Sequence, residues 1–205
     1  MSTPPLVLNP ARTALINVHW QNDIVTHEGA FATFFADQVD KHGVIDAARR
    51  LVNDFRAVGS LVVWSRAAFQ PGYPELILNT GLNKAIKQLG ALIDGSTGAD
   101  IIPELTVRAG EPVVSHPGTS GFPDTALDSI LRRREIDTVV FTGVSTNVTV
   151  EGTARDAVNL GYHVVLVSDA CTADTDAAHE ATLSTFGLLG QASTAAEIAV
   201  ALSQT

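Results

Sequence analysis

The chain has 205 residues, of which 45% are hydrophobic, and a formal net charge of −9. This length suits one domain over residues 1–205 with a sizeable core, and the acidic balance argues against nucleic acid and anionic membranes as partners. A lone cysteine, Cys171, excludes an internal disulfide and a cysteine-based zinc site and fits a reducing compartment. The first ten residues lack the features of a signal peptide, and no apolar run approaches the ~20 residues of a membrane span. We therefore expect a soluble cytoplasmic protein.

Strand-like and helical patterns alternate from one end of the chain to the other. In chain order we expect a strand over residues 13–18, a helix over 44–58, a strand over 61–64, a partly helical stretch over 76–92, a strand over 112–115, a helix over 125–134, a strand over 138–142, a helix after residue 147, a strand over 163–167, a helix near 177–187, a short strand near 191–193 and a helix over 195–202. The aromatic segment 26–38 has an irregular pattern, typical of a lid or a subunit contact. Alternating strands and helices predict a parallel sheet that helices cover on both faces.

The stretch of residues 138–157 organises the rest of the chain. Its first five residues are β-branched or aromatic, as a buried strand requires. Gly143 then permits a tight turn, and apolar residues recur at helical spacing after Asn147. This arrangement directs the first backbone N–H groups of the helix beyond the carboxyl edge of the sheet. Open α/β sheets bind their ligands at that edge.

Five short motifs occur in an order that resembles a known family. They are Gln21-Asn22-Asp23, Ser120-Gly121-Phe122, residues 143–147, residues 153–157 and residues 168–170. In this order the chain resembles the isochorismatase-like hydrolase superfamily, also called the cysteine hydrolases, over nearly its whole length. The resemblance implies a three-layer α/β/α fold with a parallel six-stranded sheet, a small-molecule substrate and assembly as a homodimer or homotetramer. Family members include amidases, nicotinamidases and true isochorismatases, and no cofactor is expected here.

The chemistry of that family rests on an Asp, a Lys and a Cys, and the resemblance places all three positions on other residues in this chain. The Asp position falls on His19, two residues before the Gln-Asn-Asp motif. The Lys position falls on His116, four residues before Ser120, and the Cys position falls on Thr149. Cys171 lies one strand further on and is interpreted as a buried structural thiol. Similarity of fold alone does not carry the activity across these changes.

Three functions are compatible with these residues. His19 and His116 can perform acid–base catalysis on a small carbonyl- or enol-ether-bearing molecule, since imidazole titrates near pH ~6.5. Thr149 can act as the nucleophile of an amidase with His19 as its base, although a Thr hydroxyl needs a strong base. The third function is that of an inactive ligand-binding or scaffolding homologue. Two histidines can also hold a metal, but a third ligand would have to come from Asp23 or further away, so we predict no metal.

The resemblance also implies how a substrate is held. The peptide bond between Val144 and Ser145 is expected to be cis and to aim backbone N–H groups at a substrate oxygen. Arg66 is either the partner of a substrate carboxylate or a surface arginine, and Asn22 belongs to the polar cluster after the first strand. The apolar walls of the pocket are expected to come from four aromatic residues: Trp20, Phe69, Tyr73 and Phe122.

Overall fold

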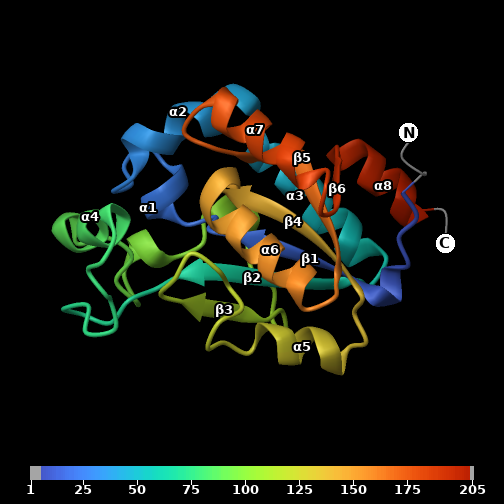
Figure 1. Cartoon of the computed structure of the whole chain (residues 1–205), viewed down its shortest axis with the longest axis horizontal. Helices are drawn as coiled ribbons and strands as arrows, with labels where there is room; N and C mark the ends of the chain where they lie inside the picture. Colours follow the sequence, from blue (N-terminus) through green and yellow to red (C-terminus); the bar gives the residue numbers. More distant parts are fainter. Residues whose placement is uncertain (1–5, 204–205) are drawn as a thin grey trace.

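Six parallel strands form one sheet in the computed structural model, which describes residues 6–203 (Figure 1). The strands are β1 (Thr13–Val18), β2 (Leu61–Ala67), β3 (Val113–His116), β4 (Thr138–Val144), β5 (His163–Thr172) and β6 (Gln191–Ser193). Their order across the sheet is β3-β2-β1-β4-β5-β6, and every neighbouring pair is parallel. The prediction of a parallel six-stranded sheet is confirmed. The prediction for the first ten residues falls partly outside the described part of the chain.

Helices cover both faces of this sheet. They are α1 (Asn22–Val25), α2 (Ala32–His42), α3 (Val44–Ala57), α4 (Gly81–Leu89), α5 (Leu127–Arg133), α6 (Glu151–Asn159), α7 (Asp176–Phe186) and α8 (Ala195–Ser203), with a π-helical turn over Thr146–Val150 before α6 and short 3₁₀ turns at Pro10–Arg12, Thr97–Ala99 and Pro103–Leu105. Among residues 6–203, no helix is long and apolar enough to cross a membrane.

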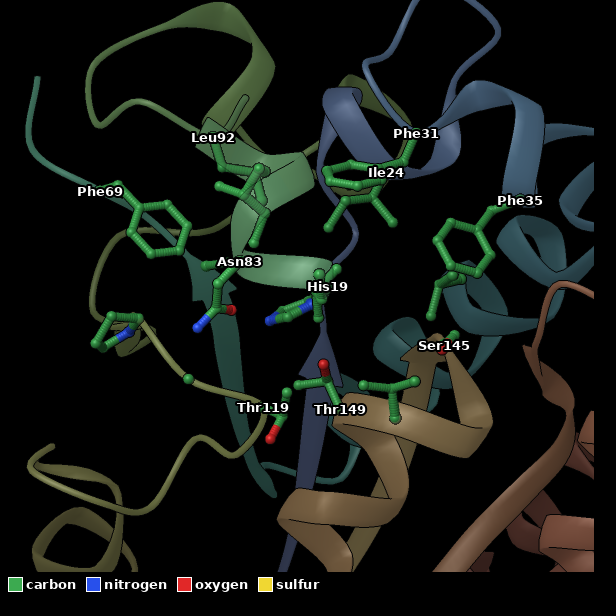
Figure 2. A pocket seen from close by; sticks show the side chains of 17 residues that line it. His19, Ile24, Phe31, Phe35, Phe69, Asn83, Leu92, Thr119, Ser145 and Thr149 are labelled. Atoms are coloured by element: carbon green, nitrogen blue, oxygen red, sulfur yellow. The ribbon is translucent and has the colours of Figure 1, made fainter. Parts of the chain in front are cut away.

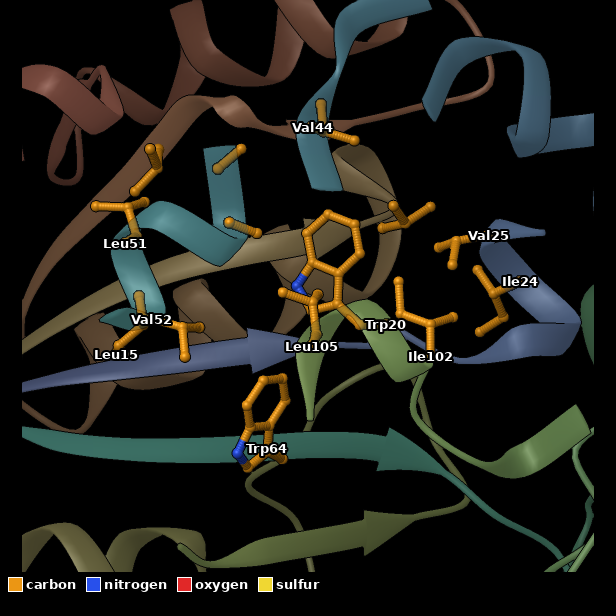
Figure 3. Packing of buried hydrophobic residues seen from close by; sticks show 14 of the residues in the cluster. Leu15, Trp20, Ile24, Val25, Val44, Leu51, Val52, Trp64, Ile102 and Leu105 are labelled. Atoms are coloured by element: carbon orange, nitrogen blue, oxygen red, sulfur yellow. The ribbon is translucent and has the colours of Figure 1, made fainter. Parts of the chain in front are cut away.

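The sheet separates two hydrophobic layers, because successive residues of a strand point to opposite faces. In β1, Leu15 belongs to the layer under α3 and α8, whereas Ala14 and Ile16 belong to the layer under α5 and α6. Figure 3 shows part of the first layer, in which Trp20 packs among residues of α3 and the loop that contains Ile102. Burial of both sheet faces explains why the strands have continuous apolar runs.

The chain changes direction in the sheet between β1 and β4. From β1 it runs outward through β2 to β3 and then returns to β4 on the other side of β1. The two central strands approach closely at their carboxyl ends, where Gly143 has a φ of 138° and faces the carbonyl oxygen of Val18. Such a reversal opens a crevice at the carboxyl edge of a parallel sheet.

The largest differences from the sequence-based expectation concern α2 and β5. The stretch 26–38 is not irregular throughout, since α2 begins at Ala32. Its buried residues Ala36 and Val39 are three apart, and the aromatic residues Phe34 and Phe35, which come just before them and are not buried, obscure that helical period. Strand β5 continues to Thr172, five residues beyond the expected end, because the register with β4 shifts between Phe141 and Gly143 and pairing then resumes.

Candidate active site

A cavity opens at the carboxyl edge of the sheet, beside the ends of β1 and β4 (Figure 2). Its volume is about 80 Å³, which is roughly half the size of an apolar protein cavity that accommodates benzene. Five polar side chains line it: His19, Asn83, Thr119, Ser145 and Thr149. Apolar side chains and a short loop form the rest of the wall: Ile24, Phe31, Phe35, Ala67, Phe69, Leu82, Ile86, Leu92, Pro117, Gly118, Val144 and Val148. A cavity of this size suits a small molecule.

His19 follows β1 directly and turns its imidazole into this cavity. Its φ of 56° lies in the left-handed region, which histidine adopts more often than most residues other than glycine. The backbone N–H of His19 donates to the carbonyl oxygen of Ser65 at 2.8 Å. This bond continues the β1–β2 pairing by one residue while the chain turns away from the strand direction.

His19 and His116 form a hydrogen-bonded pair, with their Nε2 atoms 3.3 Å apart and their rings stacked at 5.1 Å. His116 Nδ1 lies 3.0 Å from the carbonyl oxygen of Gly118, which can only accept, so Nδ1 carries the proton of neutral His116. Nε2 of His116 is then an acceptor, and His19 must carry its own proton on Nε2, because two lone pairs would otherwise face each other. Among the described residues, His19 Nδ1 has no hydrogen-bond partner. That nitrogen is left for a ligand.

Ser65 is a further part of this arrangement that the sequence reasoning missed. Its hydroxyl lies 2.9 Å from His116 Nε2, so it competes with His19 for the same acceptor and restrains the His116 ring. A side chain at Gly121 would place its Cβ 2.8 Å from this hydroxyl. The glycine of the Ser120-Gly121-Phe122 motif therefore leaves room for the Ser65 hydroxyl. The presence of glycine at position 121 was the available signal in the sequence.

Both imidazoles are neutral at ordinary pH because of where they lie. Burial lowers the pKa of His19 well below its usual value of 6.5, and the neighbouring His116 lowers it further. Burial also lowers the pKa of His116 to about 4, and the hydrogen bond to Gly118 offsets part of this effect. A buried imidazole resists protonation because the charged form loses its hydration. In this neutral state the pair can accept a proton as a base, but it does not contain an imidazolium that could act as an acid.

Thr149 lies across the cavity from these rings, in the π-helical turn after β4. Its hydroxyl points toward His19 in Figure 2. The peptide bond between Val144 and Ser145, just before this turn, is cis, as the resemblance implies. Thr153 connects this turn to the neighbouring loop, since its hydroxyl donates to the Thr149 carbonyl at 2.7 Å and accepts from the N–H of Gly121 at 3.1 Å.

Of the four aromatic residues expected in the pocket walls, only Phe69 lines the cavity. Trp20 points to the opposite side of the chain, where its indole N–H donates to Thr142 at 3.2 Å. Tyr73 lies behind Phe69 and donates to the carbonyl of Ala91, and Phe122 stacks with Tyr162 in the second hydrophobic layer. The walls come instead from Phe31, Phe35 and α4, whose sequence pattern resembles ordinary helix packing.

Two polar residues expected to bind substrate also lie outside the cavity. Asn22 donates to the carbonyls of Thr97 and Asp100, at 2.8 and 3.3 Å. The guanidinium of Arg66 pairs with Asp94 at 2.6 Å and donates to Ser115 at 2.9 Å. Both residues fix the loop of residues 92–100, which closes one side of the site.

Asp23, the residue considered as a third metal ligand, fixes the same loop. Its carboxylate accepts from the N–H of Leu92 at 2.7 Å and from that of Ala30 at 3.4 Å. Within residues 6–203, no group of three His, Cys, Asp or Glu side chains has an arrangement suited to a metal ion. Asp23 instead positions Leu92, which belongs to the cavity wall.

Cys171 is buried in β5, opposite Gly143, and does not line the cavity. Its Sγ lies 3.6 Å from the carbonyl oxygen of Phe141. Burial raises the pKa of this thiol to about 12, which leaves almost no thiolate at neutral pH. The expected strand over residues 163–167 ends before Cys171, but β5 extends to Thr172 and includes it.

We expect Cys171→Ser to retain catalysis, because the thiol is neutral and separated from the cavity by β4. The serine hydroxyl can keep the hydrogen bond to Phe141, so the fold should survive. Steady-state kinetics of the variant should agree with those of the wild type within about twofold, and iodoacetamide should label the native thiol far more slowly than the denatured one. A folded Cys171→Ser protein without activity would contradict this assignment.

The fold and this site define an α/β protein with a small cavity at the topological reversal of a parallel sheet. Comparison with known proteins agrees: residues 13–197 match the family described as Isochorismatase domain, and the chain belongs to that family. It is 34% identical over 173 residues to the uncharacterized isochorismatase family protein YwoC of Bacillus subtilis, covering 84% of each chain. Among solved structures, a cysteine hydrolase from Pseudomonas syringae pv. phaseolicola is similar at 27% identity, with a TM-score of 0.88 and coverage of 100% of this chain and 99% of that chain. N-carbamoylsarcosine amidase from Thermoplasma acidophilum follows at 28% identity, with a TM-score of 0.74 and coverage of 90% and 96%.

Proposed function

We propose that the protein is an isochorismatase-like hydrolase that acts on a small carbonyl-bearing molecule by acid–base catalysis from His19, without a cysteine nucleophile. His19, His116 and Thr149 take the places of the family's Asp, Lys and Cys. The observation that carries this proposal is the orientation of the histidine pair. His19 Nδ1 has no partner among the described residues, whereas His19 Nε2 is directed at His116.

In the proposed reaction, His19 Nδ1 takes a proton from the water that attacks the substrate carbonyl carbon. The positive charge that develops on His19 is shared with His116 through the Nε2 contact, and Ser65 holds His116 in place. When the intermediate collapses, Nδ1 returns the proton to the leaving group. Neutral imidazoles support this sequence better than direct protonation of an enol ether, which requires an imidazolium at the start.

Thr149 has a secondary role in this proposal. Its hydroxyl faces the same space as His19 and can donate to the substrate oxygen that becomes negative. A threonine hydroxyl has no appreciable ionised fraction at neutral pH and needs a strong base to attack an amide. Among the described residues, no hydrogen bond joins the Thr149 hydroxyl to His19, so no base is in place to activate it. An inactive ligand-binding homologue would not require the buried, hydrogen-bonded His19–His116 pair, whose burial costs free energy.

The pH dependence of the reaction tests the role of His19. Because catalysis requires neutral imidazole, and burial and His116 lower the pKa of His19, kcat/KM should be constant between about pH 7 and 9 and decrease only below about 6.5. A panel of small neutral amides, esters and ureas supplies the substrate for this measurement. A decrease that is centred at or above pH ~6.5 would contradict the assignment.

Unfolding must be measured over the same pH range as a control. Below about pH 6.5 an unfolded chain binds protons on histidines that stay neutral when folded. The free energy of unfolding therefore decreases as the pH is lowered. For His116 this loss extends to about pH 4. Circular dichroism at each pH separates a titrating catalyst from a partly unfolded one.

A further inference from the structure

We infer that this cavity selects an uncharged ligand, a small neutral carbonyl compound with one apolar end, and excludes the corresponding carboxylate. This inference rests on the proposed function for its choice of a carbonyl group and otherwise concerns binding alone. It follows from the charge of the side chains around the cavity, from the places of the nearest cations and from the distribution of polarity inside.

No side chain that lines the cavity is an aspartate, glutamate, lysine or arginine in the described part of the chain. The polar members are three hydroxyls, one amide and the imidazole of His19. Hydroxyl and amide groups satisfy a neutral carbonyl by hydrogen bonding, and they leave a carboxylate without a countercharge.

The cationic side chains of the neighbouring elements β2 and α4 do not line the cavity. Arg66, near the end of β2, forms an ion pair with Asp94 at 2.6 Å and lines a different pocket, together with residues of the segment 100–107. Lys84 and Lys87 belong to α4, which contributes Asn83 and Ile86 to the wall, but both lysines are exposed and neither lines the cavity. A bound carboxylate would therefore lose water without gaining an ion pair.

The histidine pair does not supply the missing positive charge. His19 and His116 are buried, and protonation of either one would put a cation into a region with little water. Removing an anion from water without a partner costs several kilocalories per mole, whereas a neutral amide needs only hydrogen bonds. The site thus discriminates by charge before it discriminates by shape.

The polarity inside the cavity has a direction that orients such a ligand. Figure 2 shows Ile24, Phe31 and Leu92 on one side and Thr119, Ser145 and Thr149 on the other, with His19 between them. A neutral molecule places its carbonyl group beside Thr149 and His19, and its apolar end beneath the phenyl rings. The reacting carbon then lies next to the base.

Binding of two isosteric probes tests this inference. Isobutyramide and isobutyrate have nearly the same shape and differ in charge at neutral pH. Titration of labelled protein by NMR at pH 7.5 should give saturable shifts at the cavity residues for the amide. The carboxylate should bind at least about 30-fold more weakly. Equal affinity, or saturable binding of neither probe at the cavity, would overturn the inference.

Two matched variants on α4 each introduce one lysine, the first in the wall of the cavity and the second outside it. Leu82 is 41% exposed and lines the cavity, whereas Leu89 is 51% exposed and does not. Leu82→Lys should raise the affinity for isobutyrate about tenfold by supplying a countercharge, and Leu89→Lys should leave the ratio of the two affinities unchanged. Equal effects of the two variants would mean that net charge, not the cavity, governs binding.

The two proposals can fail separately. Preference for the amide without turnover of any neutral carbonyl compound would uphold the ligand class and contradict the catalytic role of His19. Turnover of a carboxylate-bearing substrate that depends on His19 would do the reverse.

Discussion

His19→Ala should lower kcat/KM by about 10²–10⁴-fold, the typical contribution of a positioned general acid or base. The substitution removes the only imidazole among the described residues that line the cavity, since His116 does not line it. Nothing else in the described wall can accept the proton of an attacking water with comparable basicity, because the remaining polar groups are hydroxyls and an amide. Steady-state kinetics on the best neutral substrate is the measurement.

Two controls give this result its meaning. Thr149→Val keeps the shape of the side chain and removes its hydroxyl, and it should cost far less than His19→Ala. His163→Ala changes an exposed histidine at the start of β5, at the other edge of the sheet, and should leave the rate unchanged. If Thr149→Val instead abolishes turnover in a folded protein, and mass spectrometry detects an ester on Thr149, the reaction is covalent and the amidase reading holds.

Gly143→Ala should destabilise the fold by about 4 kcal/mol or more, because two strands meet where the new methyl group would lie. An added Cβ would overlap the carbonyl oxygen of Val18, which belongs to β1. Separating the strands at this point would break the pairing at the carboxyl ends of β1 and β4. It would also displace His19 and Ser145, the next residues at these strand ends. The denaturation midpoint should fall by roughly 10 °C, and activity should fall as well.

Gly161→Ala is the matched control for backbone conformation. Gly161 also has a positive φ, 88°, but an added Cβ meets nothing within 4 Å. This variant should cost only about 1–2 kcal/mol, the penalty of a left-handed conformation for a residue with a side chain. If Gly143→Ala costs no more than Gly161→Ala, the close approach of β1 to β4 does not constrain residue 143.

The order and type of most elements could be predicted from local pattern. Strand β1 ends at Val18 as expected, because a buried β-branched run gives way abruptly to a polar cluster. Strand β5 could not be bounded in this way. Its polar residues Ser168 and Asp169 interrupt the apolar run, and the strand continues only because β4 offers a shifted register. Long-range pairing overrides local composition there.

The candidate site could be predicted as a place but not as a set of contacts. His19, His116 and Thr149 each follow an expected strand, and parallel strands bring their carboxyl ends to one edge. The structure places His19 and Thr149 in the wall of one cavity. His116 does not line it but contacts His19 through the two Nε2 atoms. Their chemical roles remain predictions that the variants above address.

The sequence by itself determined the alternation of strands and helices, the edge that carries the site and the exclusion of disulfide chemistry, because these follow from periodicity, chain order and cysteine count. Only the tertiary structure decided which side chains enter the cavity. His19 and Trp20 are neighbours, yet the first turns into the cavity and the second into the core. The ion pair of Arg66 with Asp94 and the lowered pKa of His19 depend on segments that meet only in the folded chain. Such contacts have no local signal in the sequence, since the distances and burial that produce them arise only from packing.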